Sequence, residues 1–437
     1  MRSPANHTGV KGLAAVVLGA GASGLAAARL LASRGARVRL LDVNPGAVDA
    51  ALESELTALG IAVRLGEHTA EDFQGARLVA ISPGIPAAKL AHLMPAGAEL
   101  VSELELASRF TSEPILAITG TNGKTTTTML ASAILAAAGK KVFTGGNIGT
   151  PLSEHVLRGE KADALVLEVS SFQLQNISTF RPQAAALLNF SANHLDYHAD
   201  MAEYLAAKLR LFVNQTPDDL AVAPEDMREV LSKTPFTRAR TVYFAPRGRF
   251  EAPGLPGVHN QANMEAAYAL CAHFGVDEKT AGQAMASFVP AGHRLERVGE
   301  KGGVLFIDDS KATTVEALRA AIESCDRPVR LLAGGVFKGG DLEGLTPLLR
   351  ARVKSAGLFG ASREIFEAAW AGALPLFWEP TLEGAVKRLY GQAKPGETML
   401  LSPATASFDL YSGYKARGDD FKRIFRELPE RAGEDKR

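Results

Sequence analysis

Cysteine is nearly absent from this chain. Only Cys271 and Cys325 occur among its 437 residues, which are too few for a disulfide framework or for a metal cluster built on cysteine spacing. Unpaired thiols are typical of reducing compartments, so we expect a cytoplasmic protein.

The chain also lacks an excess of charge of either sign. Its 48 Lys and Arg residues equal its 48 Asp and Glu residues. No overall field therefore attracts nucleic acid, an anionic membrane surface or an acidic partner, and we expect none of these as partners. Any anionic ligand must be bound at a local site.

Long apolar runs are missing as well. No segment reaches the roughly 18 uninterrupted apolar residues that cross a bilayer. The small and apolar stretch 13–31 is similar to a signal sequence in composition, but it contains GAGASG and then Arg29. A strand, a glycine turn and a helix account for these features better, so we expect no secretion signal.

What the sequence does contain is a regular alternation of apolar runs and alanine-rich stretches, such as AVVLG before ASGLAAARLLASRG and PILAITG before TTTTMLASAILAAAG. This alternation predicts α/β domains with parallel sheets. At roughly 150 residues per domain, the length predicts three domains. We place them at 1–101, 102–290 and 291–437, because a polar segment with Pro114 and a break at Pro290 each precede a new set of strands.

The strongest single motif is ILAITGTNGKTTTTML, in which an apolar strand runs into a glycine-rich turn, a lysine, a run of hydroxyls and a helix. In a phosphate loop, backbone N–H groups cradle phosphate oxygens, the lysine contacts the β- and γ-phosphates, and the hydroxyl binds Mg²⁺. The alternative is an ordinary glycine turn with a capping threonine. The predicted ATP-binding residues here are Gly120, Thr121, Asn122, Gly123, Lys124, Thr125 and Thr126.

A second predicted metal ligand ends another apolar run, ALVLE, at Glu168. A carboxylate at the end of a strand next to a phosphate loop is suited to Mg²⁺. An edge charge or a helix N-terminal acid is the alternative.

The N-terminal segment GAGASG matches the GxGxxG pattern after a strand, and Asp42 ends the next strand 18 residues later. By itself this pattern is a dinucleotide-binding fingerprint, so a nicotinamide dehydrogenase remains a rival hypothesis. A separate phosphate loop at 120–125 argues against that rival, because a simple dehydrogenase does not use ATP.

Taken in order, many motifs of this chain resemble those of the Mur ligases, and the resemblance covers nearly the whole sequence. They are GTNGKTT, GGNIG, LEVSSFQL, LNFSANHLDYH, AAKLRLF, HNQAN, GHRLE, DDSKAT and SPATASFDLYSGYKARGDDF. DSKAT, SPATASFD and GAGASG are similar to the members that add D-glutamate in particular. The chain departs from the family pattern at Asn193, Gly292 and Thr314.

The resemblance implies a fold and an activity. The expected fold is a Rossmann-like N-terminal domain, a central ATPase-like domain with a P-loop, and a Rossmann-like C-terminal α/β domain. The expected activity is ATP-dependent amide formation between UDP-N-acetylmuramoyl-L-alanine and D-glutamate in peptidoglycan precursor synthesis. It also implies two Mg²⁺ sites, and we expect a monomer.

Roles for individual residues are implied in the same way. Residues expected to hold the UDP-linked substrate are Gly21, Ala22, Ser23, Gly24, Asp42, Ser82, Gly84, Asn147 and His194. Those expected to bind ATP beyond the phosphate loop are Asn260, Asn263, Arg294 and Asp309. D-Glutamate is assigned to Thr313, Lys338, Ser407 and Tyr414. The implied metal ligands are Thr125, Glu168, His194 and Lys208, and the implied catalytic residues are Lys124, His194, Lys208 and Lys311.

Other interpretations of these residues stay open. Asn260 and Asn263 could cap a helix, and Lys338 could be a solvated turn lysine. His293 has no assigned role. A nucleotide sensor without turnover is the rival function, although Glu168, Lys208 and the D-glutamate residues argue against it.

Lys208 carries one further prediction. At 100° per residue, Tyr204, Leu205 and Leu209 share one helical face with Met201 and Phe212, and Lys208 lies near its middle. A lysine there could extend its ammonium to solvent. Burial would instead lower its pKa and give a neutral amine that captures CO₂ as a carbamate, an anionic oxygen ligand for Mg²⁺.

Overall fold

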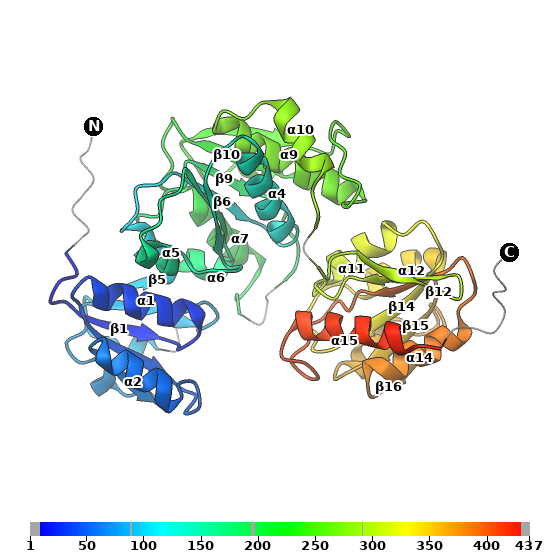
Figure 1. The fold of residues 1–437 in the computed structure, drawn as a ribbon, viewed down its shortest axis with the longest axis horizontal. Helices are drawn as coiled ribbons and strands as arrows, with labels where there is room; N and C mark the ends of the chain where they lie inside the picture. Colours follow the sequence, from blue (N-terminus) through cyan, green and yellow to red (C-terminus); the bar gives the residue numbers. More distant parts are fainter. Residues whose placement is uncertain (1–8, 88–89, 194–196, 291, 430–437) are drawn as a thin grey trace. The chain divides into compact units, whose positions relative to one another are not determined.

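Three separate β-sheets, each covered by helices, form the framework of the chain (Figure 1). The computed structural model describes residues 9–87, 90–193, 197–290 and 292–429. The chain divides into two units: Met1–Phe190 with Ala202–Glu251 and Ala262–Ala286, and Ser191–Met201 with Ala252–Gln261 and Ser287–Arg437. The first unit contains two of the sheets and the second contains the third. The predicted domain boundaries at 101 and 290 remain predictions.

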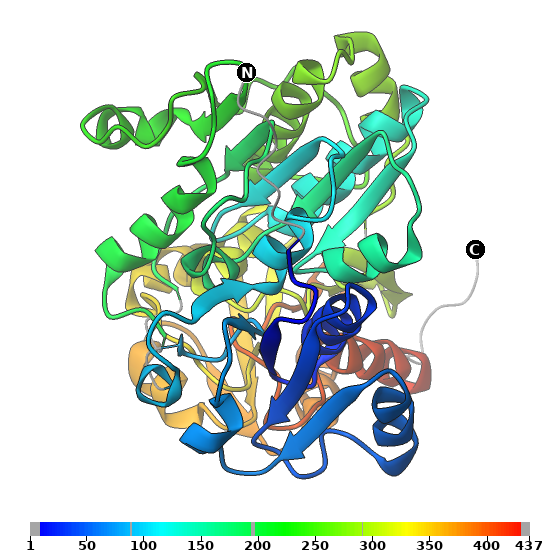
Figure 2. The same ribbon diagram turned by 90° about the vertical axis from the view of Figure 1, so that its left-hand side faces the viewer.

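The N-terminal sheet is parallel, in the order β3-β2-β1-β4-β5 (Figure 2, blue). Its strands are β1 (Ala14–Leu18), β2 (Arg37–Asp42), β3 (Ile61–Leu65), β4 (Leu78–Ile81) and β5 (Glu99–Ser102). Its helices are α1 (Ala22–Ser33), α2 (Ala50–Ala58), α3 (Glu103–Ser108), and the 3-10 helices η1 (Ala70–Phe73) and η3 (Ala91–Leu93). The strand order reverses between β1 and β4, and ligands of open α/β sheets bind at the carboxyl ends of strands at such a reversal.

The central sheet is also parallel, in the order β11-β10-β9-β6-β8-β7. Its strands are β6 (Ile115–Thr119), β7 (Val142–Gly146), β8 (Ala164–Glu168), β9 (Ala184–Leu187), β10 (Leu220–Pro224) and β11 (Arg240–Phe244). The helices of this part of the chain are α4 (Lys124–Ala137), α5 (Leu152–Arg158), α6 (Ser171–Gln175), α7 (Met201–Leu209), α8 (Arg228–Ser232), α9 (Val258–His273) and α10 (Glu278–Ala286), with η4 (Arg210–Phe212) and η5 (Glu225–Met227).

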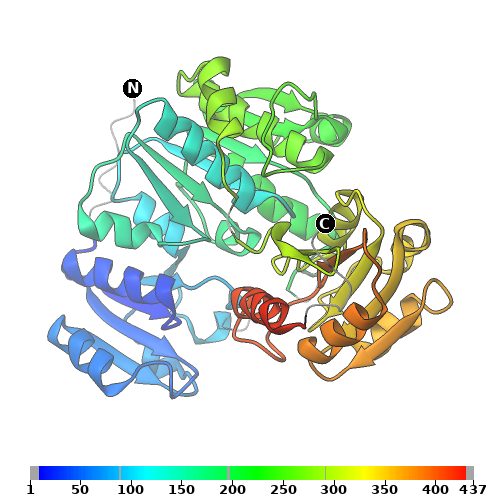
Figure 3. The same cartoon turned by 45° about the vertical axis from the view of Figure 1, so that its right-hand side comes forward.

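The third sheet has the order β12-β13-β17-β14-β15-β16, in which only the pairing of β12 with β13 is antiparallel. Its strands are β12 (Glu296–Lys301), β13 (Val304–Asp308), β14 (Val329–Gly334), β15 (Val353–Phe359), β16 (Leu376–Glu379) and β17 (Thr398–Leu401). Its helices are α11 (Val315–Glu323), η6 (Glu343–Leu345), α12 (Thr346–Arg352), α13 (Arg363–Ala369), α14 (Leu382–Gln392) and α15 (Tyr414–Glu427), the last in red in Figure 3.

Strands buried on both faces explain why the apolar runs of the sequence are continuous rather than alternating. In β14, Leu331 and Ala333 pack in the cluster that includes α11, α12 and α13. Leu332, between them, packs in the cluster that includes α14 and α15. No helix in the part of the chain that the structure describes is long and apolar enough to cross a membrane.

Candidate active site

The glycine turn after β1 forms a tight strand-to-helix connection at the reversal point of the first sheet. Gly21 is the N-cap of α1, and Ala22, Ser23 and Gly24 begin that helix. A Cβ atom on Gly24 would lie 1.7 Å from the carbonyl oxygen of Gly19, so this close approach requires glycine. The close packing of strand against helix at this turn therefore depends on glycine at position 24.

Two predicted substrate residues are fixed against this turn. Asp42, which ends β2, accepts a hydrogen bond from the N–H of Ala20 at 2.7 Å. Ser82, which follows β4, donates to the carbonyl oxygen of Gly19 at 3.4 Å. Gly84 lies two residues beyond it with φ of 89°. The structure thus brings Asp42 and Ser82 together with the GAGASG turn, and Gly84 follows in the same loop as Ser82.

The predicted phosphate loop has the expected form: β6 ends at Thr119, four residues turn, and α4 begins at Lys124. Gly123 has φ of 79°, a left-handed conformation that glycine adopts without strain. Thr125 and Thr126 lie in the first turn of α4, where backbone N–H groups and the helix dipole favour an anion.

Two asparagines support this loop. Asn189, beyond the end of β9, accepts from the N–H of Asn122 at 2.8 Å and donates to its carbonyl oxygen at 3.0 Å. A Cβ atom on Gly123 would lie 2.4 Å from Oδ1 of Asn263, so the side chain of Asn263 lies directly against the loop. Asn260 and Asn263 both lie inside α9, which begins at Val258, so neither is its N-cap. The helix-cap interpretation is therefore wrong.

Glu168 connects the phosphate loop to the loop after β7. Its Oε2 accepts from the hydroxyl of Thr125 at 2.6 Å, and its Oε1 accepts from the amide of Asn147 at 2.9 Å. The register that pairs Ile118 with Glu168 places these groups at the same edge of the sheet. Glu168 is only 3% exposed, so its carboxylate is held rather than solvated.

This pair fits a divalent metal by its chemistry. The hydroxyl of Thr125 and the carboxylate of Glu168 are hard oxygen donors of the kind that Mg²⁺ prefers, and they lie in hydrogen-bond contact. His194, another implied ligand, lies outside the described residues. Thr125 and Glu168 therefore suit Mg²⁺. In a phosphate loop, the hydroxyl at the position of Thr125 is the one that binds the metal held by the phosphates.

Lys208 is buried beside the same loop, as the helical pattern predicts. Its side chain is 2% exposed, and its Nζ donates to the carbonyl oxygen of Gly120 at 2.9 Å. Lys124 donates to the same oxygen at 2.9 Å and to that of Thr121 at 2.8 Å. Burial, and then the charge of Lys124, hold the pKa of Lys208 well below its usual value. Two lysine nitrogens thus converge on the phosphate loop.

In the third sheet, three loops that carry predicted D-glutamate residues meet at the carboxyl edge. Val336, two residues before Lys338, exchanges two backbone hydrogen bonds of 2.9 Å with Ala406, which precedes Ser407. Ala404 donates to the carbonyl oxygen of Ala312, next to Thr313, at 3.0 Å. The Nζ of Lys311 lies 5.2 Å from the centre of the Tyr414 ring. Four predicted residues, Lys311, Thr313, Lys338 and Ser407, therefore lie on connected loops, and the fifth, Tyr414, begins α15 beside Lys311.

Asp309 lies just beyond the end of β13, and its buried carboxyl group accepts hydrogen bonds from within the protein. It accepts from the hydroxyl of Ser402 at 2.9 Å and from the N–H of Leu295 at 3.2 Å. Burial raises the pKa of Asp309 to about 7, although the hydrogen bond from Ser402 and the charge of Arg294 oppose this. Burial, and then the charge of Arg294, lower the pKa of His259 to about 4, so His259 is neutral.

Thr314, where the chain departs from the family pattern, caps α11 by accepting a hydrogen bond from the N–H of Ala317.

The raised pKa of Asp309 predicts a pH-dependent stability. The folded chain keeps this proton up to about pH 7, whereas the unfolded chain loses it near pH 4, so this group lowers stability as pH rises between those values. We expect the advantage of Asp309→Asn over the native residue to grow by at most about 3 kcal/mol between pH 5 and pH 7 and to stay constant above. Calorimetric unfolding at several pH values measures it.

The control for this prediction is Asp326→Asn, which changes an exposed carboxylate of the same unit. A difference between Asp309→Asn and the native chain that stays constant from pH 5 to pH 8 would contradict the assignment of the raised pKa.

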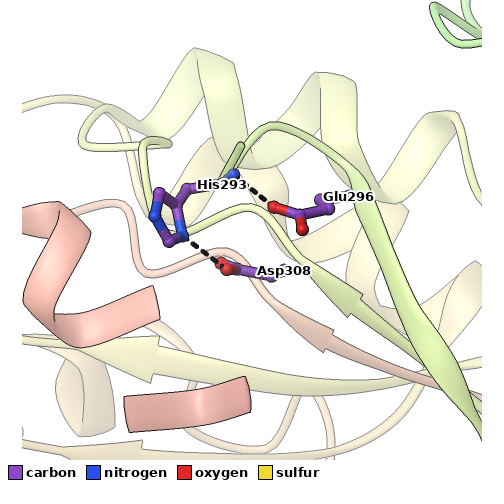
Figure 4. A group of neighbouring side chains, drawn as sticks. All are labelled: His293, Glu296 and Asp308. Atoms are coloured by element: carbon purple, nitrogen blue, oxygen red, sulfur yellow. Dashed lines mark hydrogen bonds and ion pairs between the residues drawn. The ribbon is translucent and has the colours of Figure 1, made fainter. Parts of the chain in front are cut away.

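His293, to which the sequence assigned no role, forms part of a compact charged group (Figure 4). Its Nδ1 lies 2.7 Å from Oδ2 of Asp308, and its N–H donates to Glu296 at 2.8 Å. Ligand-type atoms of the three residues lie within 4.8 Å of one another. The ammonium of Lys422, however, lies 2.7 Å from Glu296 and 3.9 Å from Asp308. A cation is thus already present, so the group is an ion-pair network rather than a metal site.

Sequence reasoning missed two supports of the site. Asn189, in the motif LNFSANHLDYH, holds the phosphate loop. Arg417, in KARGDD, is completely buried between loops of the third sheet. A signal for Arg417 exists: it precedes Phe421 by four residues and Ile424 by seven, and so shares the buried stripe of α15.

Comparison with known proteins places the chain in a family. Family models match at 14–102 (Mur ligase MurD-like, N-terminal domain), 118–252 (Mur ligase middle domain) and 293–405 (Mur ligase, glutamate ligase domain). The UDP-N-acetylmuramoylalanine–D-glutamate ligase of Desulfovibrio desulfuricans is 55% identical over 421 residues, which cover 95% of this chain and 97% of the relative. The enzyme of that name from Lawsonia intracellularis is 48% identical over 413 residues, 94% of each chain.

Solved structures agree on the fold. The MurF ligase from Thermotoga maritima, in complex with ADP, has a TM-score of 0.59 with this chain and is 18% identical over 97% of this chain and 96% of that one. UDP-N-acetylmuramate-alanine ligase from the same organism has a TM-score of 0.57, with 17% identity over 95% and 99%. Together with the sequence relatives, these matches mean that the chain belongs to the Mur ligase family, in its branch of UDP-N-acetylmuramoylalanine–D-glutamate ligases.

Proposed function

We propose that this chain joins the L-alanyl carboxylate of UDP-N-acetylmuramoyl-L-alanine to the amine of D-glutamate, using ATP and releasing ADP and phosphate. The observation that carries the reaction class is the phosphate loop, where Lys124, Lys208, Thr125 and Glu168 converge on one strand-to-helix turn. The substrates follow from the enzyme names of relatives that are 50–55% identical over nearly the whole chain.

The chemistry requires ATP because a carboxylate does not react with an amine at neutral pH. Transfer of the γ-phosphoryl group to the alanyl carboxylate gives an acyl phosphate, whose phosphate can leave when the amine attacks. Phosphoryl transfer depends mainly on positioning and on neutralising negative charge. Lys124 and the N–H groups of the loop would hold the β- and γ-phosphates, and Lys311 would lie near the transferring phosphate.

Mg²⁺ would be held by Thr125 and Glu168, with Lys208 as a carbamate and His194 as further ligands. When bound, the ion would neutralise phosphate charge. Asn147 orients the carboxylate of Glu168 through the hydrogen bond between them and would face the sugar substrate. Two metal sites and the carbamate belong to this proposal.

The remaining residues are proposed to bind the UDP part of the substrate and ATP. The turn at Gly21–Gly24, with Asp42, Ser82 and Gly84, would bind the UDP part at the reversal point of the first sheet. Asn260, Asn263, Arg294 and Asp309 would bind the nucleoside and phosphates of ATP. We also propose that the chain is a cytoplasmic monomer. The compartment is supported by the two cysteines, Cys271 and Cys325, which are free and buried, as suits a reducing environment.

The direct test is ADP release in the presence of UDP-N-acetylmuramoyl-L-alanine and Mg²⁺, with each candidate amino acid added in turn. We expect release with D-glutamate and little with L-glutamate, L-alanine or a diamino acid. A better rate with L-glutamate or a diamino acid would show that the proposed substrate is wrong, even though the family is right.

Lys338 gives a prediction on specificity. D-Glutamate carries two carboxylates, and Lys338 is the cation on the loop after β14. We expect Lys338→Ala to raise the KM for D-glutamate about tenfold or more while the KM for ATP stays nearly unchanged. Steady-state kinetics with each substrate varied measures both values.

The matched control is Lys354→Ala, because Lys354 is an exposed lysine of the same unit on β15. Equal increases of both KM values in Lys338→Ala, or an unchanged KM for D-glutamate, would remove Lys338 from the proposed amino-acid site.

A further inference from the structure

A buried arginine without a carboxylate partner lies beneath the loops of the third sheet. Arg417 is 0% exposed. Charged side chains are rarely buried this deeply unless an opposite charge pairs with them. Among the residues that the structure describes, no acidic group forms an ion pair with Arg417; Asp409 and Asp308 act on it only at longer range.

Neutral oxygens surround the guanidinium instead. Its Nε donates to the hydroxyl of Ser310 at 3.0 Å, and its Nη2 donates to the carbonyl oxygens of Ser310 at 2.8 Å and Thr405 at 3.1 Å. Its Nη1 donates to the carbonyl oxygen of Ala406 at 3.4 Å. The arginine therefore ties the segment that carries Lys311 to the loop that carries Ser407.

The N-terminus of α15 adds partial positive charge at the position of Arg417. Arg417 lies in the first turn of α15, which begins at Tyr414, and that turn contains no acidic residue. A helix N-terminus already carries partial positive charge, so a cation there is the reverse of the usual preference. Burial lowers the pKa of Arg417 to about 10, which still leaves it charged at neutral pH.

A further hydrogen bond joins this centre to the predicted amino-acid site. The hydroxyl of Ser310, which accepts from Arg417, donates to the carbonyl oxygen of Tyr414 at 2.8 Å. A neutral side chain could fill this space at a lower desolvation cost. What the arginine adds is a positive charge and several N–H donors in a fixed geometry, both directed at loops that we assign to a substrate with two carboxylates.

We propose that Arg417 is a positioning residue whose buried charge, together with the N-terminus of α15, holds the Ser310 and Thr405–Ser407 segments in place and favours a carboxylate of D-glutamate at Ser407 and Tyr414. This inference rests on the proposed function. It assigns a role in amino-acid binding to a residue that does not itself contact the substrate.

The test compares Arg417→Met and Arg417→Lys with Arg330→Met. Arg330 is a suitable control because it is also largely buried in this unit, but it is paired with Glu397 at 2.8 Å near the opposite end of β14. We expect Arg417→Met to raise the KM for D-glutamate at least tenfold and to leave the KM for ATP within threefold. Arg417→Lys keeps the charge but not the guanidinium geometry, so the KM for D-glutamate should rise by an intermediate amount. Arg330→Met should leave both KM values within threefold.

A merely structural role would change both KM values together or neither. A folded Arg417→Met with a KM for D-glutamate within threefold of the native value overturns the proposal, as does an equal rise for ATP. Where Arg417→Met does not fold, Arg417→Lys decides by the same criterion, with a rise above threefold for D-glutamate alone as support. Native enzyme without ADP release dependent on D-glutamate would overturn the proposed function and this inference together.

Discussion

Replacing Lys124 with alanine should abolish ADP formation and leave the fold intact. The Nζ of Lys124 donates to two loop carbonyls, those of Gly120 and Thr121, and the residue is only partly buried. Its loss therefore removes little packing, but it removes the positive charge nearest to the predicted position of the β- and γ-phosphates. We expect a fall in turnover of about 1000-fold or more, because charge neutralisation dominates phosphoryl transfer.

Turnover is measured by ADP release, and folding by the thermal unfolding midpoint. Lys141→Ala is the matched control, since Lys141 is an exposed lysine next to β7 of the same sheet. Turnover of Lys124→Ala within tenfold of the native rate would contradict the phosphate-loop assignment. A large fall in the unfolding midpoint would instead show that the lysine is needed for the fold.

The phosphate loop could be predicted from sequence because all its parts are local. A strand that ends at Thr119, glycines that permit the turn, and a helix that begins at Lys124 lie within a few residues of one another. The position of Glu168 could be predicted for a related reason: the carboxyl ends of parallel strands meet at one edge of the sheet, whichever strands are neighbours.

Contacts that depend on strand order could not be predicted. Asn189 reaches the phosphate loop only because β9, rather than another strand, pairs with β6, and its hydrogen bond to Asn122 joins residues 67 positions apart. The pairing of His293 with Asp308 likewise requires β12 to fold back antiparallel on β13. Sequence patterns locate strands, but the order in which they pair is decided by tertiary packing.

Burial of charged residues is an intermediate case. Helical periodicity predicts that Lys208 lies on an apolar face, and the structure confirms its burial. The same periodicity places Arg417 on the buried stripe of α15, yet the surrounding sequence YKARGDDFKR is so polar that exposure is the simpler expectation. The difference arises from carbonyl oxygens of distant loops, which provide partners for Arg417 that no local pattern reveals.

Lys208 provides the second prediction with a large effect. An ammonium group in this position would be poorly solvated and would lie beside Lys124, which is why the pKa of Lys208 is held far below its usual value. A neutral amine can form a C–N bond with CO₂ and lose its proton, which gives a carbamate. The product is an anion with two oxygens, and it would relieve the repulsion between the two lysines and offer an oxygen ligand to Mg²⁺.

We therefore expect Lys208→Ala to be nearly inactive, with a loss of about 100-fold or more, because both a metal ligand and a balancing charge are removed. Acetate or propionate should restore part of the activity, since a short carboxylic acid can enter the vacated space and supply the missing carboxylate. The measurement is ADP release as a function of the added acid. Lys124→Ala is the control, because its loss of a cation cannot be repaired by a carboxylate.

Two results would contradict the carbamate. One is an active Lys208→Ala enzyme without added acid, which would show that no ligand is needed at this position. The other is the absence of a carbamate carbon signal when the native protein is saturated with ¹³C-labelled CO₂, ATP and Mg²⁺. Lys208→Ala provides the blank for that spectrum, since the burial of Lys208 on α7, at 2% exposure, makes its amine the one that should give the signal.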